Sequence, residues 1–208
     1  MEKAQVKQAL GTGVVIEAVQ SLTGAESIAP DHMGRSRVSA VGYIPTHVDI
    51  DAKVLRQLQV QLTLQGALLD ARRWNEWMDM FSTDGIYWMP AAPEQTDWTS
   101  QPSIFAEDRL LMEIRAARLN HPNAWSQAAH WATQHLLGTT IVEQASDKSI
   151  STWTQFQMLE VRRDKVRQFG GSYRHDWALE QGHWKIRMQR VDLFNAQASY
   201  DYVIQAWI

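Results

Sequence analysis

Histidine is the residue type in this chain best suited to hold a metal ion, so its spacing is considered first. The chain has seven histidines, and His130 and His135 are five positions apart. On a strand an odd spacing turns two side chains to opposite faces, and on a helix five residues place them roughly 140° apart. His175 and His183 flank a turn, but alternation directs Asp176 to the opposite face. The spacing therefore predicts no metal site within this chain.

The chain contains no cysteine. This absence excludes a disulfide, a thiolate nucleophile and a cysteine-bound zinc site. Even a Rieske iron–sulfur centre needs two thiolates beside its two histidines. The sequence also has neither a Gly-x-Ser-x-Gly nucleophile elbow nor a Walker-type phosphate loop. Any redox cluster that serves this protein must therefore lie on another chain.

A small set of polar residues has the side chains for general acid–base chemistry. Asp84 and Tyr87 are close in sequence, and His130 or His135 from a later strand would complete the set. In a pocket, these groups would polarise a carbonyl, as a dehydratase or an isomerase does. Asp84 is explained equally well as a turn residue before Gly85. Both interpretations stay open at this point.

Tryptophan is abundant: ten of 208 residues are Trp, although the total aromatic fraction of 10% is ordinary. Trp buries a large area and carries one N–H that needs a partner, so it is common both in cores and in protein–protein interfaces. The sequence alone does not decide between these two uses. The candidate interface residues are Trp74, Trp77, Trp88, Trp98, Trp125 and Trp131.

Charge and hydropathy exclude two classes of partner. The net charge is −3 and both signs are scattered along the chain, so no basic stripe predicts nucleic acid as a partner. No stretch approaches the roughly 20 apolar residues of a membrane helix. Met1–Leu10 is polar, and Val14–Ile16 is too short for the core of a signal peptide. The sequence predicts a cytoplasmic protein with no membrane contact.

The elements that must position these residues fall into two regions. Residues 1–50 are rich in Gly and Pro and have no sustained periodicity, which predicts an extension or arm. Residues 51–208 are predicted to form one domain. Within it, helical periodicity covers 54–69, 71–81 and 104–119. In the last of these, Ser103 is the expected cap, and Leu110, Leu111 and Ile114 share one side.

The rest of the domain is rich in strand-forming residues. The predicted strands are 86–89, 139–143, 150–162, 166–179, 183–194 and 200–207, joined by short polar turns. Gly170-Gly171 interrupts the fourth of these and indicates a bulge or a sharp bend. Helices followed by a bent antiparallel sheet indicate an α+β fold with the helices on one sheet face.

Three runs of the sequence resemble the small (β) subunits of aromatic-ring-hydroxylating dioxygenases. The first is Leu68–Phe81 with Asp84 and Tyr87, where the family shows Leu-Asp, Arg, an aromatic residue, Glu-Trp, then Phe and an acidic residue before Tyr. The second extends from Glu113-Ile114-Arg115 to His121-Pro122-Asn123-Ala124-Trp125-Ser126-Gln127. The third is Phe169-Gly170-Gly171 with the following Trp184-Lys185-Ile186. Together they cover about residues 52–208.

The resemblance implies a fold and a division of labour. The fold would be a cone, a strongly curved mixed or antiparallel sheet packed on N-terminal helices, like nuclear transport factor 2 and scytalone dehydratase. The chain would be a structural subunit without catalytic residues or cofactors, three copies packing against three large (α) subunits. The large subunit would carry a Rieske 2Fe-2S cluster and a mononuclear Fe(II). Electrons would come from NAD(P)H through a reductase and, in some systems, a ferredoxin.

The reaction implied by the resemblance is oxygen insertion into an aromatic ring. The family inserts both atoms of O₂ to give a cis-dihydrodiol, or in some systems one atom as a hydroxylation. The run Asn120–Gln127 is similar to benzoate-type systems, which implies an aromatic acid as substrate. A free-standing cone-fold dehydratase or isomerase, using Asp84, Tyr87, His130 and His135, is the alternative.

Overall fold

A computed structural model of the chain describes residues 43–121, 123–124, 131–200, 202–205 and 207–208. All of them belong to one unit of the chain, Ser36–Ile208. Most of the predicted extension lies outside the described residues, so a boundary at residue 51 stays a prediction. The elements are α2 (Ala52–Asp70), α3 (Trp74–Met78), β1 (Phe81–Pro90), β2 (Ser103–Glu107), α4 (Arg109–Leu119), β3 (Trp131–Ala145), β4 (Ser149–Arg162), β5 (Lys165–Glu180) and β6 (His183–Leu193).

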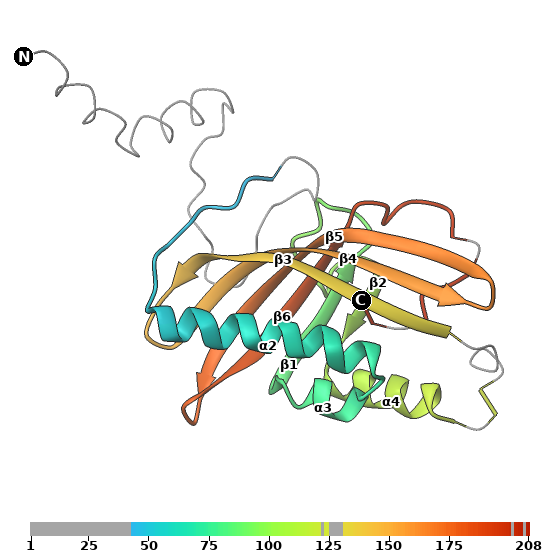
Figure 1. Ribbon diagram of the computed structural model, residues 1–208, viewed down its shortest axis with the longest axis horizontal. Coiled ribbons are helices and arrows are strands. Elements are labelled where there is room, and N and C mark those ends of the chain that lie inside the picture. Colours follow the sequence, from blue (N-terminus) through green and yellow to red (C-terminus); the bar gives the residue numbers. More distant parts are fainter. Residues whose placement is uncertain (1–42, 122, 125–130, 201, 206) are drawn as a thin grey trace, which may run out of the picture. The chain divides into compact units, whose positions relative to one another are not determined.

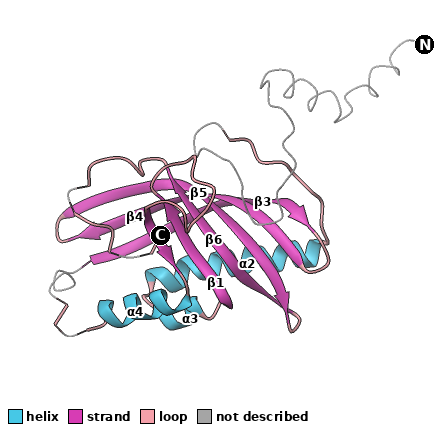
Figure 2. Cartoon of the chain, turned by 180° about the vertical axis from the view of Figure 1, so that it is seen from behind, coloured by secondary structure: helices cyan, strands magenta, loops and turns pink. Residues whose placement is uncertain are grey.

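The six strands form one mixed sheet in the order β2-β1-β6-β5-β4-β3. Neighbouring strands are antiparallel except β1 and β6, which are parallel. The helices lie against one face of the sheet in Figure 1, and Figure 2 shows the sheet from the opposite side. Register shifts interrupt the pairing of β3 with β4 and of β5 with β6, and such irregularities increase the local bend of a sheet. The predicted α+β class is confirmed.

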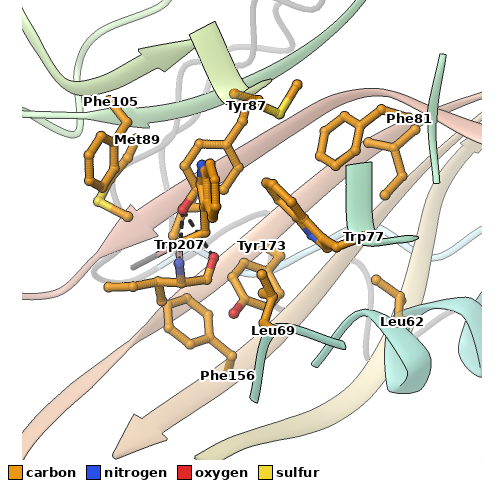
Figure 3. Packing of buried hydrophobic residues seen from close by; sticks show 14 of the residues in the cluster. Leu62, Leu69, Trp77, Phe81, Tyr87, Met89, Phe105, Phe156, Tyr173 and Trp207 are labelled. Atoms are coloured by element: carbon orange, nitrogen blue, oxygen red, sulfur yellow. Dashed lines mark hydrogen bonds between the residues drawn. The ribbon is translucent and has the colours of Figure 1, made fainter. Parts of the chain in front are cut away.

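The core lies on the helix side of the long strands: burial alternates along β4, whereas β5 and β6 each contain five consecutive buried residues. On β5, Phe169, Tyr173 and Trp177 point to the helix side and are each 1% exposed. From α2, Leu58 and Leu62 meet the sheet with exposures of 0% and 1%, one helical turn apart. Full burial of side chains of this size contributes about 1.5–3 kcal/mol each. Figure 3 shows part of this core, in which aromatic rings predominate.

Gly170 and Gly171 do not mark a bulge, contrary to the sequence expectation. β4 and β5 stay in register through both positions. Gly171 is required because β6 comes very close: a Cβ there would lie 2.0 Å from the main-chain oxygen of Asp192. A Cβ at Gly170 would meet only the main-chain oxygen of Phe156, at 3.8 Å. The register of β5 shifts instead between Asp176 and Trp177, in its pairing with β6.

The predicted helix over 104–119 is wrong in its first turn. Residues Ser103–Glu107 form β2, whose partner is β1. The helix α4 begins only at Arg109, because Asp108 caps it by accepting a hydrogen bond from the main-chain N–H of Leu111. Its core side is Met112, Ala116 and Leu119, whereas the apolar side chains noted in the sequence are 45–61% exposed. Those outward residues are Leu110, Leu111 and Ile114.

The other boundaries also differ from the sequence expectation at a few places. The second helix is only one turn long, since β1 begins at Phe81. β3 begins at Trp131, eight positions before the predicted strand. No strand forms in the described part of 200–207.

None of the described helices is long and apolar enough to span a membrane.

After β6 the chain returns to the helix side of the sheet without regular structure in its described part. We call Tyr202–Gln205, Trp207 and Ile208 the closing segment. The ring of Tyr202 packs against the guanidinium of Arg167 on β5, and its hydroxyl donates to Glu160 on β4. Trp207 and Ile208 are completely buried. Figure 3 shows Trp207 beside Tyr87 and Tyr173, in the middle of the core.

Candidate functional site

The structure does not gather the predicted acid–base residues into one site. Asp84 is exposed on β1, where pairing with β6 shifts in register. Tyr87, three positions later, is completely buried. His135 is buried on β3 beneath Gly66 of α2. His130 lies outside the described residues. An exposed Asp84 and two buried partners do not make a shared pocket.

A buried carboxylate–imidazole pair fastens α2 to β3. The Asp70 carboxylate lies 2.6 Å from Nδ1 of His135 and also accepts from the main-chain N–H of His135 and the hydroxyl of Thr133. Burial alone would raise the pKa of Asp70, but the hydrogen bonds from His135 outweigh it and lower that pKa. An imidazole oriented by a carboxylate is the geometry of a general base. Here the His135 side chain has no exposed surface and cannot reach a substrate. The pair therefore stabilises the contact between α2 and β3.

A second polar group forms a row across four strands. Tyr87 on β1 stands opposite Gln189 on β6, Gln189 opposite His175 on β5, and His175 opposite Thr152 on β4. All four are completely buried. Nε2 of His175 lies 3.1 Å from Oε1 of Gln65 on α2, which joins the row to the helix layer. Burial lowers the pKa of His175 to about 3, so the imidazole is neutral at physiological pH.

The closing segment completes this interior. Nε1 of Trp207 donates to the Glu107 carboxylate at 2.9 Å, and the same carboxylate accepts from Arg115 at 2.6 Å. The hydroxyl of Tyr87 is 3.1 Å from both the main-chain N and the main-chain O of Ile208. Burial raises the pKa of Tyr87, so its hydroxyl stays protonated and can donate. Trp207 and Ile208 therefore fill part of the core between the helices and the sheet.

Some buried polar atoms of this interior have no hydrogen-bond partner among the described residues. A polar atom that is buried without a hydrogen-bond partner lowers the stability of the folded chain. The atoms are Nε1 of Trp77, Nε2 of His135, the hydroxyl of Tyr173, Nδ1 of His175 and Oε1 of Gln189.

The described residues contain no candidate metal site. Among them, no group of three or more His, Asp or Glu side chains is placed to hold a metal ion. His175 faces the interior, whereas His183 is exposed at the start of β6. The pair that flanks the β5–β6 turn is therefore split between two environments.

The described tryptophans among those proposed for an interface occupy two different environments. Four of them are 0–4% exposed and fill the core of this chain, so they offer almost no surface to a partner: Trp74, Trp77, Trp88 and Trp131. Trp98, in the loop between β1 and β2, is half-buried. Trp125 lies outside the described residues. The structure thus gives core filling as the role of the first four.

The surface opposite the helices has features that sequence reasoning missed. Arg190 on β6 is buried beneath the β1–β2 loop, where it pairs with Asp192 and donates to the main-chain oxygens of Pro93 and Gln95. Its guanidinium also lies over the ring of Trp88. On the same sheet, Leu136 and Phe194 are exposed beside an open groove. Exposed apolar side chains that gather in patches are typical of contact surfaces.

These observations define the class of the protein: an α+β cone domain whose interior is occupied by its own closing segment. A family model for the ring hydroxylating beta subunit matches residues 65–199. The chain therefore belongs to the family of ring-hydroxylating dioxygenase β subunits, as the sequence resemblance predicted.

Two relatives have names that agree with this family. The chain is 19% identical over 155 residues to the small subunit of 2-halobenzoate 1,2-dioxygenase from Burkholderia cepacia, covering 72% of this chain and 89% of that one. It is 24% identical over 163 residues to the β subunit of benzoate 1,2-dioxygenase from Acinetobacter baylyi, covering 75% and 92%.

Solved structures confirm the cone fold. The β subunit of benzoate 1,2-dioxygenase from Burkholderia mallei superposes with a TM-score of 0.59 at 23% identity, covering 76% of this chain and 99% of that one. A putative scytalone dehydratase from Novosphingobium aromaticivorans superposes with a TM-score of 0.54 at 14% identity, covering 74% and 91%. The predicted likeness to scytalone dehydratase is thus present at the level of fold.

Proposed function

We propose that this chain is a non-catalytic structural subunit that assembles with, and stabilises, a large oxygenase subunit. The observation that carries the proposal is the filled interior: Trp207 and Ile208 occupy the cone, and Asp84 is separated from Tyr87 and His135. Because the described members of the acid–base set, Asp84, Tyr87 and His135, do not share an accessible site, the contribution that we propose is made through the surface. The exposed apolar side chains of α4 support such a surface role.

The partner in this proposal is a large subunit with a Rieske 2Fe-2S cluster and a mononuclear Fe(II), in a complex of three large and three small subunits. Closed rotational symmetry is common among soluble oligomers, and a complex of three large and three small subunits can have it. Electrons would come from NAD(P)H through a reductase, with or without a ferredoxin. Residues 1–50 would form an N-terminal extension, and its described part contacts β3, where the main-chain N–H of Val48 donates to the main-chain oxygen of Val142.

An aromatic acid is the substrate class we propose for the complex. The support is indirect: both relatives carry benzoate or a halobenzoate in their names. The active site would lie wholly on the large subunit, so this chain would not set the specificity.

Turnover by the assembled complex tests the non-catalytic role. We expect Asp84→Asn to leave kcat and KM for benzoate unchanged, because Asp84 is exposed and makes no part of a pocket. A large loss of kcat with an intact complex would contradict the proposal. As a second arm, the purified chain alone is assayed for dehydratase activity on a small hydroxylated aromatic ketone, and activity abolished by Asp84→Asn would favour the enzyme alternative.

A further inference from the structure

We propose that the cone of this chain is a binding pocket for indole-type ligands, and that the closing segment fills it by offering Trp207 as an internal ligand. The ligand class is a planar aromatic bicycle that carries one N–H donor. The inference concerns the interior of this chain and does not depend on the proposed assembly.

The indole of Trp207 is held as a ligand would be held. Its ring centroid lies 4.7 Å from that of Trp77 and 5.3 Å from that of Trp74, both tilted, so two aromatic walls enclose it. Its N–H points to the carboxylate of Glu107, which is 94% buried. Arg115 pairs with the same carboxylate and so offsets its charge. Aromatic walls with one directed acceptor are the elements of a selective small-molecule site.

A second set of contacts receives the main chain next to this ring. The Tyr87 hydroxyl bonds both the main-chain N and the main-chain O of Ile208, and the Gln189 amide is 3.5 Å from that oxygen. Tyr87 and Gln189 face each other across β1 and β6. The two strands therefore present one donor–acceptor edge beside the aromatic walls.

The residues that contact Trp207 and Ile208 all lie outside the closing segment. The contacting side chains belong to α3, β1, β2, α4 and β6, whereas the described part of the closing segment has no regular structure. Of its six described residues, Val203 is 70% exposed, whereas Ile204, Trp207 and Ile208 are buried. A segment without regular secondary structure opens at a lower cost than a strand in the sheet.

Spare polar atoms next to the occupant strengthen the case for a ligand site. The hydroxyl of Tyr173 and Nε1 of Trp77 are buried and have no partner among the described residues. Figure 3 shows Tyr173 and Trp77 near Trp207, and the ring centroids of Trp77 and Trp207 are 4.7 Å apart. The closing segment therefore satisfies only part of the hydrogen-bonding capacity around it, and a ligand with additional polar groups would use more.

Replacement of Trp207 in the full chain tests whether the pocket takes indole. The variant Trp207→Ala should lose roughly 6 to 20 °C in Tm. Indole at about ten times its Kd should restore roughly 3 to 6 °C. Benzofuran, which has the same shape but no N–H, should bind about 10- to 100-fold more weakly because the Glu107 acceptor stays unpaired.

Trp207→Phe is the matched control. Its ring still occupies the pocket, so this variant should fold even if Trp207→Ala does not, and indole should not raise its Tm. Equal rescue of Trp207→Ala by indole and benzofuran, or no rescue by either, would overturn the assigned site. If only Trp207→Phe folds, a rise of its Tm with indole would overturn the location of the site.

The unaltered chain tests whether the occupant is exchangeable. Indole at millimolar concentration should increase hydrogen exchange in the peptide that covers residues 202–208, while exchange in β4 and β5 stays the same. If indole stabilises Trp207→Ala but leaves that peptide unchanged in the unaltered chain, Trp207 is a fixed part of the core and the proposal of an exchangeable internal ligand is wrong.

Discussion

His175 makes the stability of this domain depend on pH between about pH 7.5 and about pH 5. The imidazole is completely buried and hydrogen-bonded to Gln65, and burial lowers its pKa to about 3. In the unfolded chain a histidine has a pKa of about 6.5. Between these two values the unfolded chain binds a proton that the folded chain does not bind. Stability is therefore lost as the pH falls from about 6.5 toward about 3.

The size of the effect follows from the two pKa values. Between about pH 7.5 and about pH 5 the single site removes about 2 kcal/mol from the free energy of unfolding. For a domain of this size that loss corresponds to a Tm decrease of about 4–8 °C. His175→Gln keeps a hydrogen-bonding side chain and removes the titrating group, so this part of the pH dependence should disappear.

Urea unfolding of the unaltered chain and of His175→Gln, at about pH 7.5 and about pH 5, measures the effect. The difference in unfolding free energy between the two proteins should shift by about 2 kcal/mol in favour of the variant at the lower pH. Groups such as Asp70, whose pKa is lowered, lose their stabilisation only below about pH 4 and cancel in the difference. His183→Gln, at an exposed position, should show no such shift. Parallel pH profiles for the unaltered chain and His175→Gln would refute the reasoning.

Three further changes test the packing and the fastening contacts. Asp70→Asn should cost about 2–3 kcal/mol in urea unfolding at neutral pH, because it weakens the bonds to His135; the cost should start to fall below about pH 4 and disappear only where folded Asp70 becomes protonated, because its pKa is lowered in the folded chain. Gly171→Ala should cost about 3 kcal/mol or more by placing a Cβ against β6, whereas Gly170→Ala should change stability by less than about 0.5 kcal/mol; equal costs would contradict the close approach. Arg190→Gln should make the β1–β2 loop sensitive to limited proteolysis, because that loop loses its main-chain anchors; an unchanged cleavage pattern would show that the loop is held by other contacts.

The sheet was the most predictable part of the fold. The expected strands 150–162, 166–179 and 183–194 correspond to β4, β5 and β6 within one residue at each end. These strands are long and alternate between inward and outward residues, so the pattern is fully local. The family resemblance was predictable for a related reason, because its motifs are short runs of adjacent residues.

Long-range pairing accounts for what the sequence could not predict. The residues Ser103–Glu107 read as the start of a helix, yet they form a strand because β1 pairs with them. The outward position of Ile114 on α4 has the same origin: periodicity shows that a helix has an apolar side but does not say which side the sheet covers. Tertiary contacts decide such cases.

The candidate site was hidden for the same reason. Asp70 and His135 are 65 positions apart, and Trp207 and Glu107 are 100 apart, so no local motif could pair them. Strand register alone brings Gln189 between Tyr87 and His175. The prediction that any iron–sulfur cluster lies on another chain, by contrast, rests on the absence of cysteine from the sequence and stays a prediction.

The central claim is that this chain works as a structural partner of a large oxygenase subunit. The most direct measurement is the molar mass, by size-exclusion chromatography with light scattering, of the chain co-expressed with a Rieske large subunit of a benzoate-type dioxygenase. The account predicts one equimolar complex of three large and three small subunits, with oxygenase activity that depends on this chain. A chain that elutes alone, beside a large subunit that is stable and active without it, would contradict the account.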